Sequence, residues 1–512
     1  MYRLLSLALV AALLLPAPAE AKSKKKDAPP PAVEAPPAPP PDPNAWRATP
    51  PAPAPRAEWT APVAQKLTLS NGVPVYVVPN AGLPLASVQL VVRVGREANP
   101  VGKAGLAALT ANLLDEGTKS RTASDIASTA SALGASLSVG SSDELSWVGV
   151  DLLTAELGPS LDLLADVALQ PKFASAEFDR VKGEILTSIR NGRGEPRDVA
   201  ARAFLRALYG SAHPYAAPAI GDEAGVSAIT AKDVAAFYKT WWHAGNAAFV
   251  VSGAVKPDEV RAALDARFGK WKAGKATRLT VAPPSVPMKP QIVFVPQEGA
   301  VQSVLRIGTV GPNRTSPDFM AANVAGTLVG GMFSSPINMN LRETHGWSYG
   351  AYAGFSEARD HGTFAVRTSV QADKTAPAVA EVLKELANAA GREPTAQELS
   401  LVRDNLLESL PGTFETNSGT AAAFLAVPQF GLTEDWLVAF RKDVNAVDGA
   451  SAARAAKAGF DVNRLLIVVV GPRTVATKPD AAGATAGAAD TTVDVVAELK
   501  ALGYDFREVT AP

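Results

Sequence analysis

The same order of predicted secondary structure occurs twice along this chain, once in each half. The first half has a β-rich run, a helix, an acidic-start helix and a buried strand, at 88–94, 105–114, 175–191 and 247–253. The second half repeats this order at 304–310, 318–329, 395–410 and 464–471. Phe178 and Leu399 are 221 positions apart, and Phe249 and Ile467 are 218 apart. A repeat of this kind predicts two diverged copies of one folding unit.

Each unit mixes strands and helices. Asn71-Gly72 separates two alternating runs at 66–70 and 73–78, which is a strong hairpin signal. Helical spacing also marks 122–133, 156–169 and 230–242, and two short β-rich runs at 137–139 and 146–152 favour a strand pair. The expected fold class is therefore α+β, with two tandem homologous units that each pack a β-sheet against helices.

Composition sets the expected domain boundaries. Residues 1–21 are expected to form a signal peptide and 22–58 a Pro/Ala-rich linker, because proline favours extended, solvated backbone. The first domain is expected at 59–277, and a proline-rich linker spans 276–290. The second domain is expected at 288–472, and a low-complexity tail at 473–512, with an Ala/Gly-rich stretch at 481–489 and a short helix at 493–502.

The N-terminus predicts export. Arg3 precedes an apolar segment at 4–15 that is too short to cross a bilayer, and Ala19-Glu20-Ala21 resembles a cleavage site. The mature protein is expected to be exported, to the periplasm in a Gram-negative host, with no stable membrane span after cleavage. Retention of the segment as an anchor is the alternative.

Charge and cysteine content exclude several classes of function. The net charge of −1 argues against a general nucleic-acid binder. The absence of cysteine excludes disulfides, thiolate metal sites and cysteine nucleophiles. No phosphate-binding or dinucleotide fingerprint is present either.

The helix predicted at 105–114 carries an altered metal motif. Residues 105–118 have the frame of the helix that presents H-x-x-E-H in inverted zinc peptidases. Ala108, Ala111 and Asn112 stand where His, Glu and His would be. An alanine methyl group can neither coordinate a metal nor exchange a proton.

This frame and several other fragments together resemble the pitrilysin/insulinase metallopeptidase family, over about 59–472. The other fragments are His213-Pro214-Tyr215, the aromatic run 237–242, the strand 246–253 and the segment 341–350. The resemblance implies that the third zinc ligand, a Glu about 75 positions beyond the second His, corresponds to Ser188. A hydroxyl is a poor zinc ligand beside a carboxylate.

The resemblance therefore implies that this chain holds no metal and that all three ligands and the general base are replaced. Two other donor sets remain open. Glu184 is a candidate ligand without His partners, and Asp115 with Glu116 would favour hard cations over zinc.

The second unit retains a pair that the resemblance assigns to catalysis. Family members split over two chains have a zinc-free subunit that supplies an Arg/Tyr pair, which Arg342 and Tyr349 match. The tyrosine hydroxyl donates to a developing oxyanion, and the arginine holds a substrate carbonyl. The glycine turn 330–331 before the pair predicts a close backbone approach. A strand at 347–355, or an edge near 142–150, is expected to pair with an extended peptide.

Ordinary structural roles remain open for these residues. The alanine-bearing helix is also compatible with a plain amphipathic helix. Arg342 can pair with Glu343 or Glu357, and Tyr349 can be a plain strand residue. The four histidines, His213, His243, His345 and His361, lack metal-ligand spacing, which favours hydrogen-bonded or surface positions.

The expected function is that of a zinc-free subunit in an exported heterodimeric peptidase, inactive alone. Its expected partner is a homologous chain with an intact H-x-x-E-H motif and bound zinc, and its substrate an extended peptide. The alternative is a non-enzymatic peptide-binding or assembly scaffold with the same fold.

Overall fold

The structure of the chain is a computed structural model. It describes residues 44, 47, 59–284, 289–477 and 491–512. One compact unit runs from Trp59 to Pro512. The predicted signal peptide, nearly all of the predicted linker 22–58, residues 285–288 of the second predicted linker and the Ala/Gly-rich stretch 481–489 lie outside the described residues.

A six-stranded sheet organises the first half, with the strand order β1-β2-β6-β3-β5-β4. Its strands are β1 (Gln65–Thr68), β2 (Pro74–Pro79), β3 (Leu85–Val92), β4 (Ser136–Ser141), β5 (Ser146–Leu153) and β6 (Ala247–Gly253). The predicted Asn-Gly hairpin joins β1 to β2, and Gly72 has a φ of 88°, a conformation that glycine adopts without strain.

A second six-stranded sheet organises the other half, with the order β14-β7-β11-β8-β10-β9. Its strands are β7 (Gln291–Pro296), β8 (Gln302–Gly311), β9 (Ser348–Phe355), β10 (Gly362–Gln371), β11 (Leu466–Gly471) and β14 (Asp505–Glu508). A separate two-stranded sheet pairs β12 (Thr474–Thr477) with β13 (Thr491–Asp494).

The two large sheets confirm the repeat. In each sheet the first two central strands, β2 with β6 and β7 with β11, pair in parallel, and the next three pairings are antiparallel. Only the outermost strand differs, because β1 pairs antiparallel whereas β14 pairs parallel. The fold is α+β with two tandem units, as the sequence predicts.

Eight helices belong to the described residues of the first half. They are α1 (Leu106–Asn112), α2 (Ala123–Ala132), α3 (Leu157–Leu169), α4 (Ser175–Asn191), α5 (Pro196–Tyr209), α6 (Glu223–Ala228), α7 (Ala231–Trp241) and α8 (Pro257–Phe268). Thr122 and Thr230 begin α2 and α7 with capping boxes, in which the threonine oxygen accepts from the backbone N–H three residues on.

The second half carries α9 to α18 in its described residues. They are α9 (Phe319–Gly326), α10 (Pro336–Asn338), α11 (Thr375–Ala390), α12 (Ala396–Glu408), α13 (Leu410–Thr413), α14 (Asn417–Phe424), α15 (Ala426–Phe430), α16 (Trp436–Ala446), α17 (Gly449–Gly459) and α18 (Val495–Ala501). The predicted tail 473–512 is partly folded, because α18 packs through Val495 and Leu499 into the second core and β14 joins the sheet.

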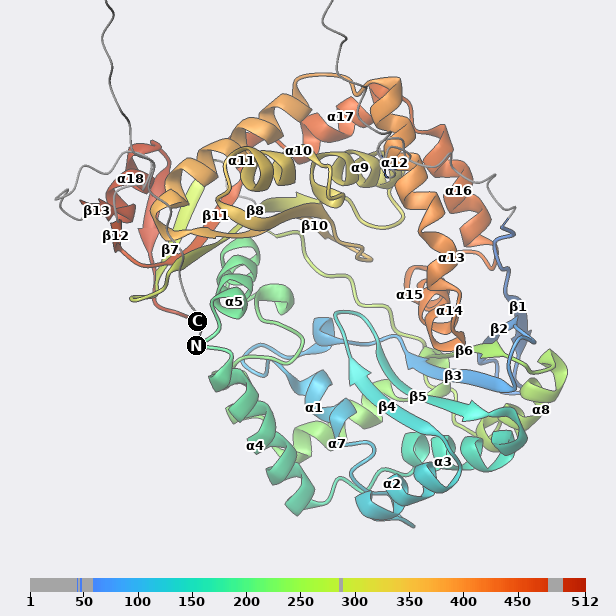
Figure 1. Cartoon of the computed structure of the whole chain (residues 1–512). Helices are drawn as coiled ribbons and strands as arrows, with labels where there is room; N and C mark the ends of the chain where they lie inside the picture. Colours follow the sequence, from blue (N-terminus) through green and yellow to red (C-terminus); the bar gives the residue numbers. More distant parts are fainter. Residues whose placement is uncertain (1–43, 45–46, 48–58, 285–288, 478–490) are drawn as a thin grey trace, which may run out of the picture. The chain divides into compact units, whose positions relative to one another are not determined.

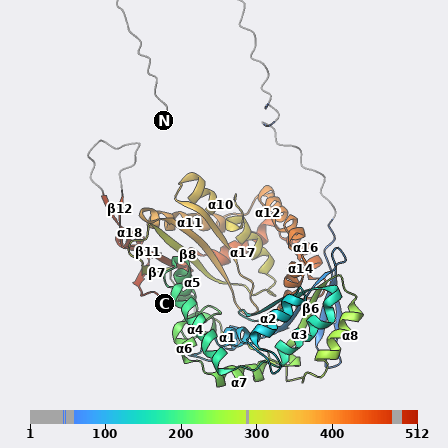
Figure 2. The ribbon, with the colours of Figure 1, turned by 60° about the horizontal axis from the view of Figure 1, so that its bottom comes forward.

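Each half sends helices onto the sheet of the other half (Figures 1 and 2). Phe204 and its neighbours on α5 share a cluster with Val293, Val468 and other residues of the second sheet. Reciprocally, Phe424 on α14 shares a cluster with Val250 and other residues of the first sheet. Burial of these apolar faces contributes to holding the halves together, at roughly 25 cal/mol per Å² removed from water.

None of the helices in the described part of the chain has both the length and the apolar character that a bilayer crossing requires.

Candidate functional site

Helix α1 is buried on nearly every side. Gly105 precedes it with a φ of 98°, and a Cβ there would lie 2.6 Å from the Ile220 carbonyl oxygen, so the close approach of this loop requires glycine. Ala108 and Ala111 are 6% and 0% exposed, but neither belongs to the main apolar cluster that contains Leu106 and Leu109. The two alanines therefore occupy a second buried side of the helix.

The structure brings Asn112 and Ser188 together, although they are 76 positions apart in the sequence. Both line one surface hollow of about 370 Å³ between the end of α1 and the middle of α4. Asp115, Glu116 and Glu184 also line it. Ala108 and Ala111 do not, because the backbone around them is covered. Ser188 therefore lies beside the end of α1, and its correspondence to a zinc-ligand position stays a prediction.

Arg180 is shared by three carboxylates on the acidic side of this hollow. Arg180 on α4 pairs with Glu116, and its Nε and Nη1 donate to Glu177 at 2.7 Å and Glu184 at 2.8 Å. Burial raises the pKa of Asp115 to about 6. Glu116 and Glu184 are therefore held in ion pairs with Arg180, and Asp115 is partly buried. These carboxylates do not converge on a common metal position.

The donor set does not fit a zinc ion. Zinc sites in proteins use imidazole, thiolate and carboxylate donors in tetrahedral arrangement. The motif positions offer two methyl groups, an amide and a hydroxyl, and no group of three His, Asp or Glu in the described residues is placed to hold a metal. The residues at these positions therefore support no catalytic step through a metal bound to this chain.

The histidines lie elsewhere. The Nε2 atoms of His213 and His361 lie 2.9 Å and 3.3 Å from the carbonyl oxygens of Ala282 and Val281. His345 stacks on Trp347 with 4.0 Å between ring centroids. His243 precedes the short turn before β6. Three of the four are thus engaged in hydrogen bonds or stacking.

Arg342 and Tyr349 form a linked pair at the edge of the second sheet. Arg342 lies in the π-helical turn 339–344, and Gly346, with a φ of 66°, ends that turn just before β9. The Nη1 of Arg342 donates to the Tyr349 carbonyl oxygen at 2.9 Å, its Nε lies 3.1 Å from a Glu343 carboxylate oxygen, and its guanidinium stacks on Phe333. The Tyr349 side chain is 87% exposed.

The glycine turn before this pair sets its position. A Cβ on Gly330 would lie 2.4 Å from the Cβ of Ala353, so the turn can press against β9 only because residue 330 is glycine. The predicted close approach is confirmed, and it holds the strand that carries Tyr349.

The Arg342–Tyr349 pair does not line the hollow that contains Asn112 and Ser188. The two predicted parts of the site are therefore separate surfaces of this chain. Strands β4 and β9 are the free edges of the two sheets at these surfaces. The predicted edge near 142–150 is wrong, because β5 is hydrogen-bonded to β3 on one side and to β4 on the other.

A buried polar joint between the halves has no counterpart in the sequence motifs. Arg359, in the β9–β10 turn, pairs with Glu97, and its backbone N–H donates to Glu144 at 2.8 Å. Tyr215 and Gln429 also donate to Glu144, both at 3.2 Å. Tyr215 belongs to the His213-Pro214-Tyr215 fragment, but no sequence signal identifies Glu97, Glu144 or Arg359, because their proximity arises only when the two halves meet.

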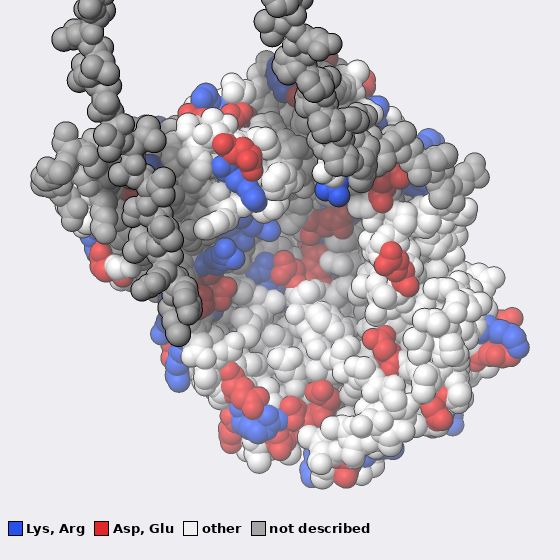
Figure 3. All heavy atoms as spheres, viewed as in Figure 1, with Lys and Arg blue, Asp and Glu red and all other residues white. Residues whose placement is uncertain are grey.

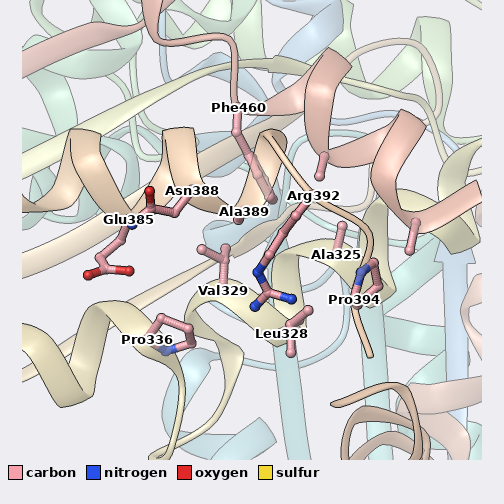
Figure 4. A pocket seen from close by; sticks show the side chains of 12 residues that line it. Ala325, Leu328, Val329, Pro336, Glu385, Asn388, Ala389, Arg392, Pro394 and Phe460 are labelled. Carbon is pink, nitrogen blue, oxygen red and sulfur yellow. The ribbon is translucent and has the colours of Figure 1, made fainter. Parts of the chain in front are cut away.

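A small cavity in the second half is not a ligand site (Figure 4). It lies among α9, α11 and α17, is lined mainly by apolar side chains such as Val329 and Phe460, and holds about 40 Å³. That space suits only a few water molecules. Arg392 at its rim is paired with Glu398 at 2.5 Å.

Comparison with known protein families identifies the family to which this chain belongs. The family profile described as "Insulinase (Peptidase family M16)" matches residues 75–221, and that described as "Peptidase M16 inactive domain" matches residues 228–406. The chain belongs to the M16 peptidase family. The first match lies within the first unit, and the second begins at the end of the first unit and extends through α12 of the second. The M16 family is the one that the sequence fragments resemble.

Relatives and solved structures agree with this assignment. An uncharacterized zinc protease of Mycobacterium leprae is 27% identical over 349 residues, which cover 67% of this chain and 77% of that protein. The M16 inactive domain structure from Pseudomonas fluorescens has a TM-score of 0.75 at 24% identity, covering 81% of this chain and all of that one. A Helicobacter pylori protease structure has a TM-score of 0.73 at 21% identity, covering 80% and 100%. The two structures support the fold alone.

Proposed function

We propose that this chain is the zinc-free subunit of an exported, heterodimeric M16 peptidase. Its partner would be a homologous chain with an intact H-x-x-E-H motif and zinc, acting in the periplasm of a Gram-negative host. The observation that carries the proposal is a contrast within one chain. The motif positions on α1 offer no imidazole, thiolate or carboxylate for zinc, whereas Tyr349 is exposed next to an arginine that anchors its backbone.

The chemistry assigned to this chain is transition-state support. A phenol hydroxyl can donate to the oxyanion that develops when a peptide carbonyl is attacked. The carbonyl of Tyr349 is held by Arg342, so the tyrosine backbone is fixed while the ring projects into solvent. Such an arrangement suits a group that must meet a substrate whose scissile carbonyl is attacked at the zinc site of the partner.

Substrate clamping is assigned to the free edge of β9. An edge strand presents N–H and C=O groups to which an extended peptide can add as a further strand. On β9 the Tyr349 carbonyl and the Ala351 N–H are already bonded to Arg342 and Asn338, so a peptide would pair with the remaining groups of the strand. Tyr349 and Tyr352 on β9 are both exposed. The substrate class proposed is therefore extended peptides or unfolded segments of proteins.

Co-purification from the native host tests this function. The expected result is a complex of this chain with an M16 chain that carries the intact motif, with zinc in the complex and peptide hydrolysis by the mixture. Robust proteolysis by this chain alone, or a tightly held zinc ion between Asn112 and Ser188, would contradict the proposal.

A scaffold without any catalytic role is the second candidate. The observation in its favour is that Arg342 already contacts the Tyr349 carbonyl and the Glu343 carboxylate, so a substrate carbonyl would have to displace one of them. Reconstitution separates the two. A scaffold would bind peptide or partner, but adding it would leave the turnover of the zinc-bearing chain unchanged.

A further inference from the structure

Two arginines lie directly opposite each other in the second sheet. Arg306 on β8 and Arg367 on β10 are register partners in an antiparallel pair. Side chains at such positions have Cβ atoms roughly 5 Å apart, and like charges there are destabilising. The pair therefore has an electrostatic cost that an isolated surface arginine does not have.

Neither guanidinium has a carboxylate or hydrogen-bond partner among the described residues of the protein. Other arginines nearby are paired, as Arg314 is with Glu357 and Arg359 with Glu97. Arg306 is half-buried, and its guanidinium lies 5.7 Å from the centre of the Phe204 ring. Burial, with Arg367 nearby, lowers the pKa of Arg306 to about 10, which still leaves it charged at neutral pH.

Strand register identifies the face on which the two cations lie. Arg306 is the register partner of Val468 on β11, and Val468 is the partner of Val293 on β7. These two valines pack with α5, the helix contributed by the first half. Arg306 and Arg367 are therefore on the α5 side of the sheet rather than on the side covered by α11. Figure 3 shows Lys and Arg side chains in the hollow of the molecule, with Asp and Glu side chains beside them.

The pair is also close to the strand edge assigned to substrate. Strand β9 lies between β10 and any peptide added to the sheet edge. Neighbouring strands are about 4.8 Å apart, so an added peptide would run roughly 10 Å from β10. Arg367 on β10 and an acidic side chain that lean toward each other can span this distance. Arg306 on β8 lies one strand further away, roughly 14 Å from such a peptide, and its guanidinium is next to Phe204 of α5, so it acts through its charge beside Arg367.

We propose that Arg367, with the positive charge of Arg306 directly behind it, binds a carboxylate of the extended peptide that docks on β9, and so selects acidic peptides. This inference rests on the proposed function, because it assumes that peptides bind along this edge. A carboxylate offers two oxygens that match arginine donors and would remove the repulsion between the two guanidinium groups. Acidic side chains and the C-terminal carboxylate of a peptide present the same chemistry.

Three labelled peptides of one 12-residue sequence test this subsite. The first has a central Glu and an amidated C-terminus, the second a central Gln and a free C-terminus, and the third a central Gln and an amidated C-terminus. Fluorescence anisotropy with the purified chain, at low salt, measures each affinity. We expect at least one carboxylate peptide to bind about tenfold more tightly than the neutral one, and the tighter of the two identifies the source of the carboxylate.

Matched variants assign the preference to these residues. Arg367→Gln changes an exposed side chain and is not expected to disturb folding, and Arg306→Gln removes the half-buried partner. Arg367→Gln is expected to abolish most of the preference, and Arg306→Gln to weaken it by removing the neighbouring charge. Arg507→Gln is the control, because Arg507 on β14 is the register partner of Val293 and thus lies on the same face at the opposite edge. That variant is expected to retain the full preference.

The results of these binding measurements distinguish failure of the carboxylate subsite from failure of the proposed peptide docking on β9. Equal binding of all three peptides, or a preference that survives both substitutions, overturns the subsite and leaves peptide docking in place. Failure of every peptide to bind the chain overturns the subsite together with substrate clamping. Circular dichroism and thermal unfolding of each variant show whether a lost preference reflects a lost fold.

Discussion

The side chain of Arg342 holds the backbone of Tyr349, with 2.9 Å between Nη1 and the carbonyl oxygen. The pair therefore acts as one unit. The arginine fixes the backbone at the start of β9, and the tyrosine hydroxyl is left exposed to a substrate. This contact explains how two residues seven positions apart can be placed reproducibly at an exposed edge.

Replacing Tyr349 by Phe should lower turnover of the reconstituted peptidase by about 10²-fold, because one oxyanion donor is lost. Assembly should be unaffected, since the ring is 87% exposed. Peptide turnover and size-exclusion chromatography of the mixture measure the two effects. Tyr352→Phe on the same strand is the control and should leave turnover near that of the wild type. Unchanged turnover in Tyr349→Phe would remove the role assigned to its hydroxyl.

Arg342→Gln should lower turnover through Tyr349, because the carbonyl of that residue loses its charged donor. We expect the double variant Arg342→Gln with Tyr349→Phe to be little worse than Tyr349→Phe alone, since residues that act as a unit are not additive. A double-variant cycle on turnover checks this. Fully additive losses would indicate that Arg342 acts on the substrate independently.

The purified chain should contain no stoichiometric zinc. The triple variant Ala108→His, Asn112→His and Ser188→Glu restores three ligands and should bind about one zinc ion per chain. Metal analysis after dialysis measures both, and Ser188→Glu alone is the control, because it adds a carboxylate without imidazoles. Stoichiometric zinc in the unaltered chain that is lost in Asn112→Ala would refute the assignment of a metal-free helix.

Glu97 should make stability depend on pH. Burial raises its pKa from 4.5 to about 7, against the opposing effect of Arg359 and with a further contribution from Glu144. A folded-state pKa above the unfolded one means that the folded protein holds this proton more tightly. The protonated Glu97 therefore contributes its full stabilisation of the folded state below pH 4.5. This contribution to the free energy of unfolding, up to about 3 kcal/mol, is lost as the pH rises through about 7.

Urea unfolding at pH 5 and pH 8 measures this dependence. Glu97→Gln, which keeps an oxygen acceptor for the Gly95 N–H, should reduce the difference in unfolding free energy between the two pH values. Glu357→Gln is the control, since Glu357 is an exposed carboxylate. An unchanged pH dependence in Glu97→Gln would show that other groups produce it.

Local patterns predict most of the individual elements. The bounds of α4 and β6 agree with the predicted 175–191 and 247–253, because acidic residues near a helix start and a continuous apolar run are local signals. Helix α5 is not among the predicted elements, although Pro196 at its first turn and apolar residues such as Val199 and Phe204 are signals for it. The predicted low-complexity tail contains β14, whose pairing with β7 is not visible in composition.

The candidate site is only partly predictable. Motif spacing identifies the altered helix and Ser188, and the structure places Asn112 and Ser188 beside one hollow. Motif spacing does not identify the buried joint of Glu97, Glu144 and Arg359, since its members are single residues in distant loops. Motif spacing also does not identify the Arg306–Arg367 pair, because the register between two strands determines which residues are opposite each other.

The sequence by itself determined the repeated α+β unit, the absence of His, Cys and carboxylate side chains at positions 108, 111, 112 and 188, and the seven-residue spacing of Arg342 and Tyr349, since each depends on residue type and local spacing. Tertiary structure alone decided that α5 and α14 cross to the opposite sheets, that β9 is a free edge and that Arg306 meets Arg367. These features depend on pairings between residues far apart in the chain, which hydrophobic burial and hydrogen bonding select only when the whole unit folds.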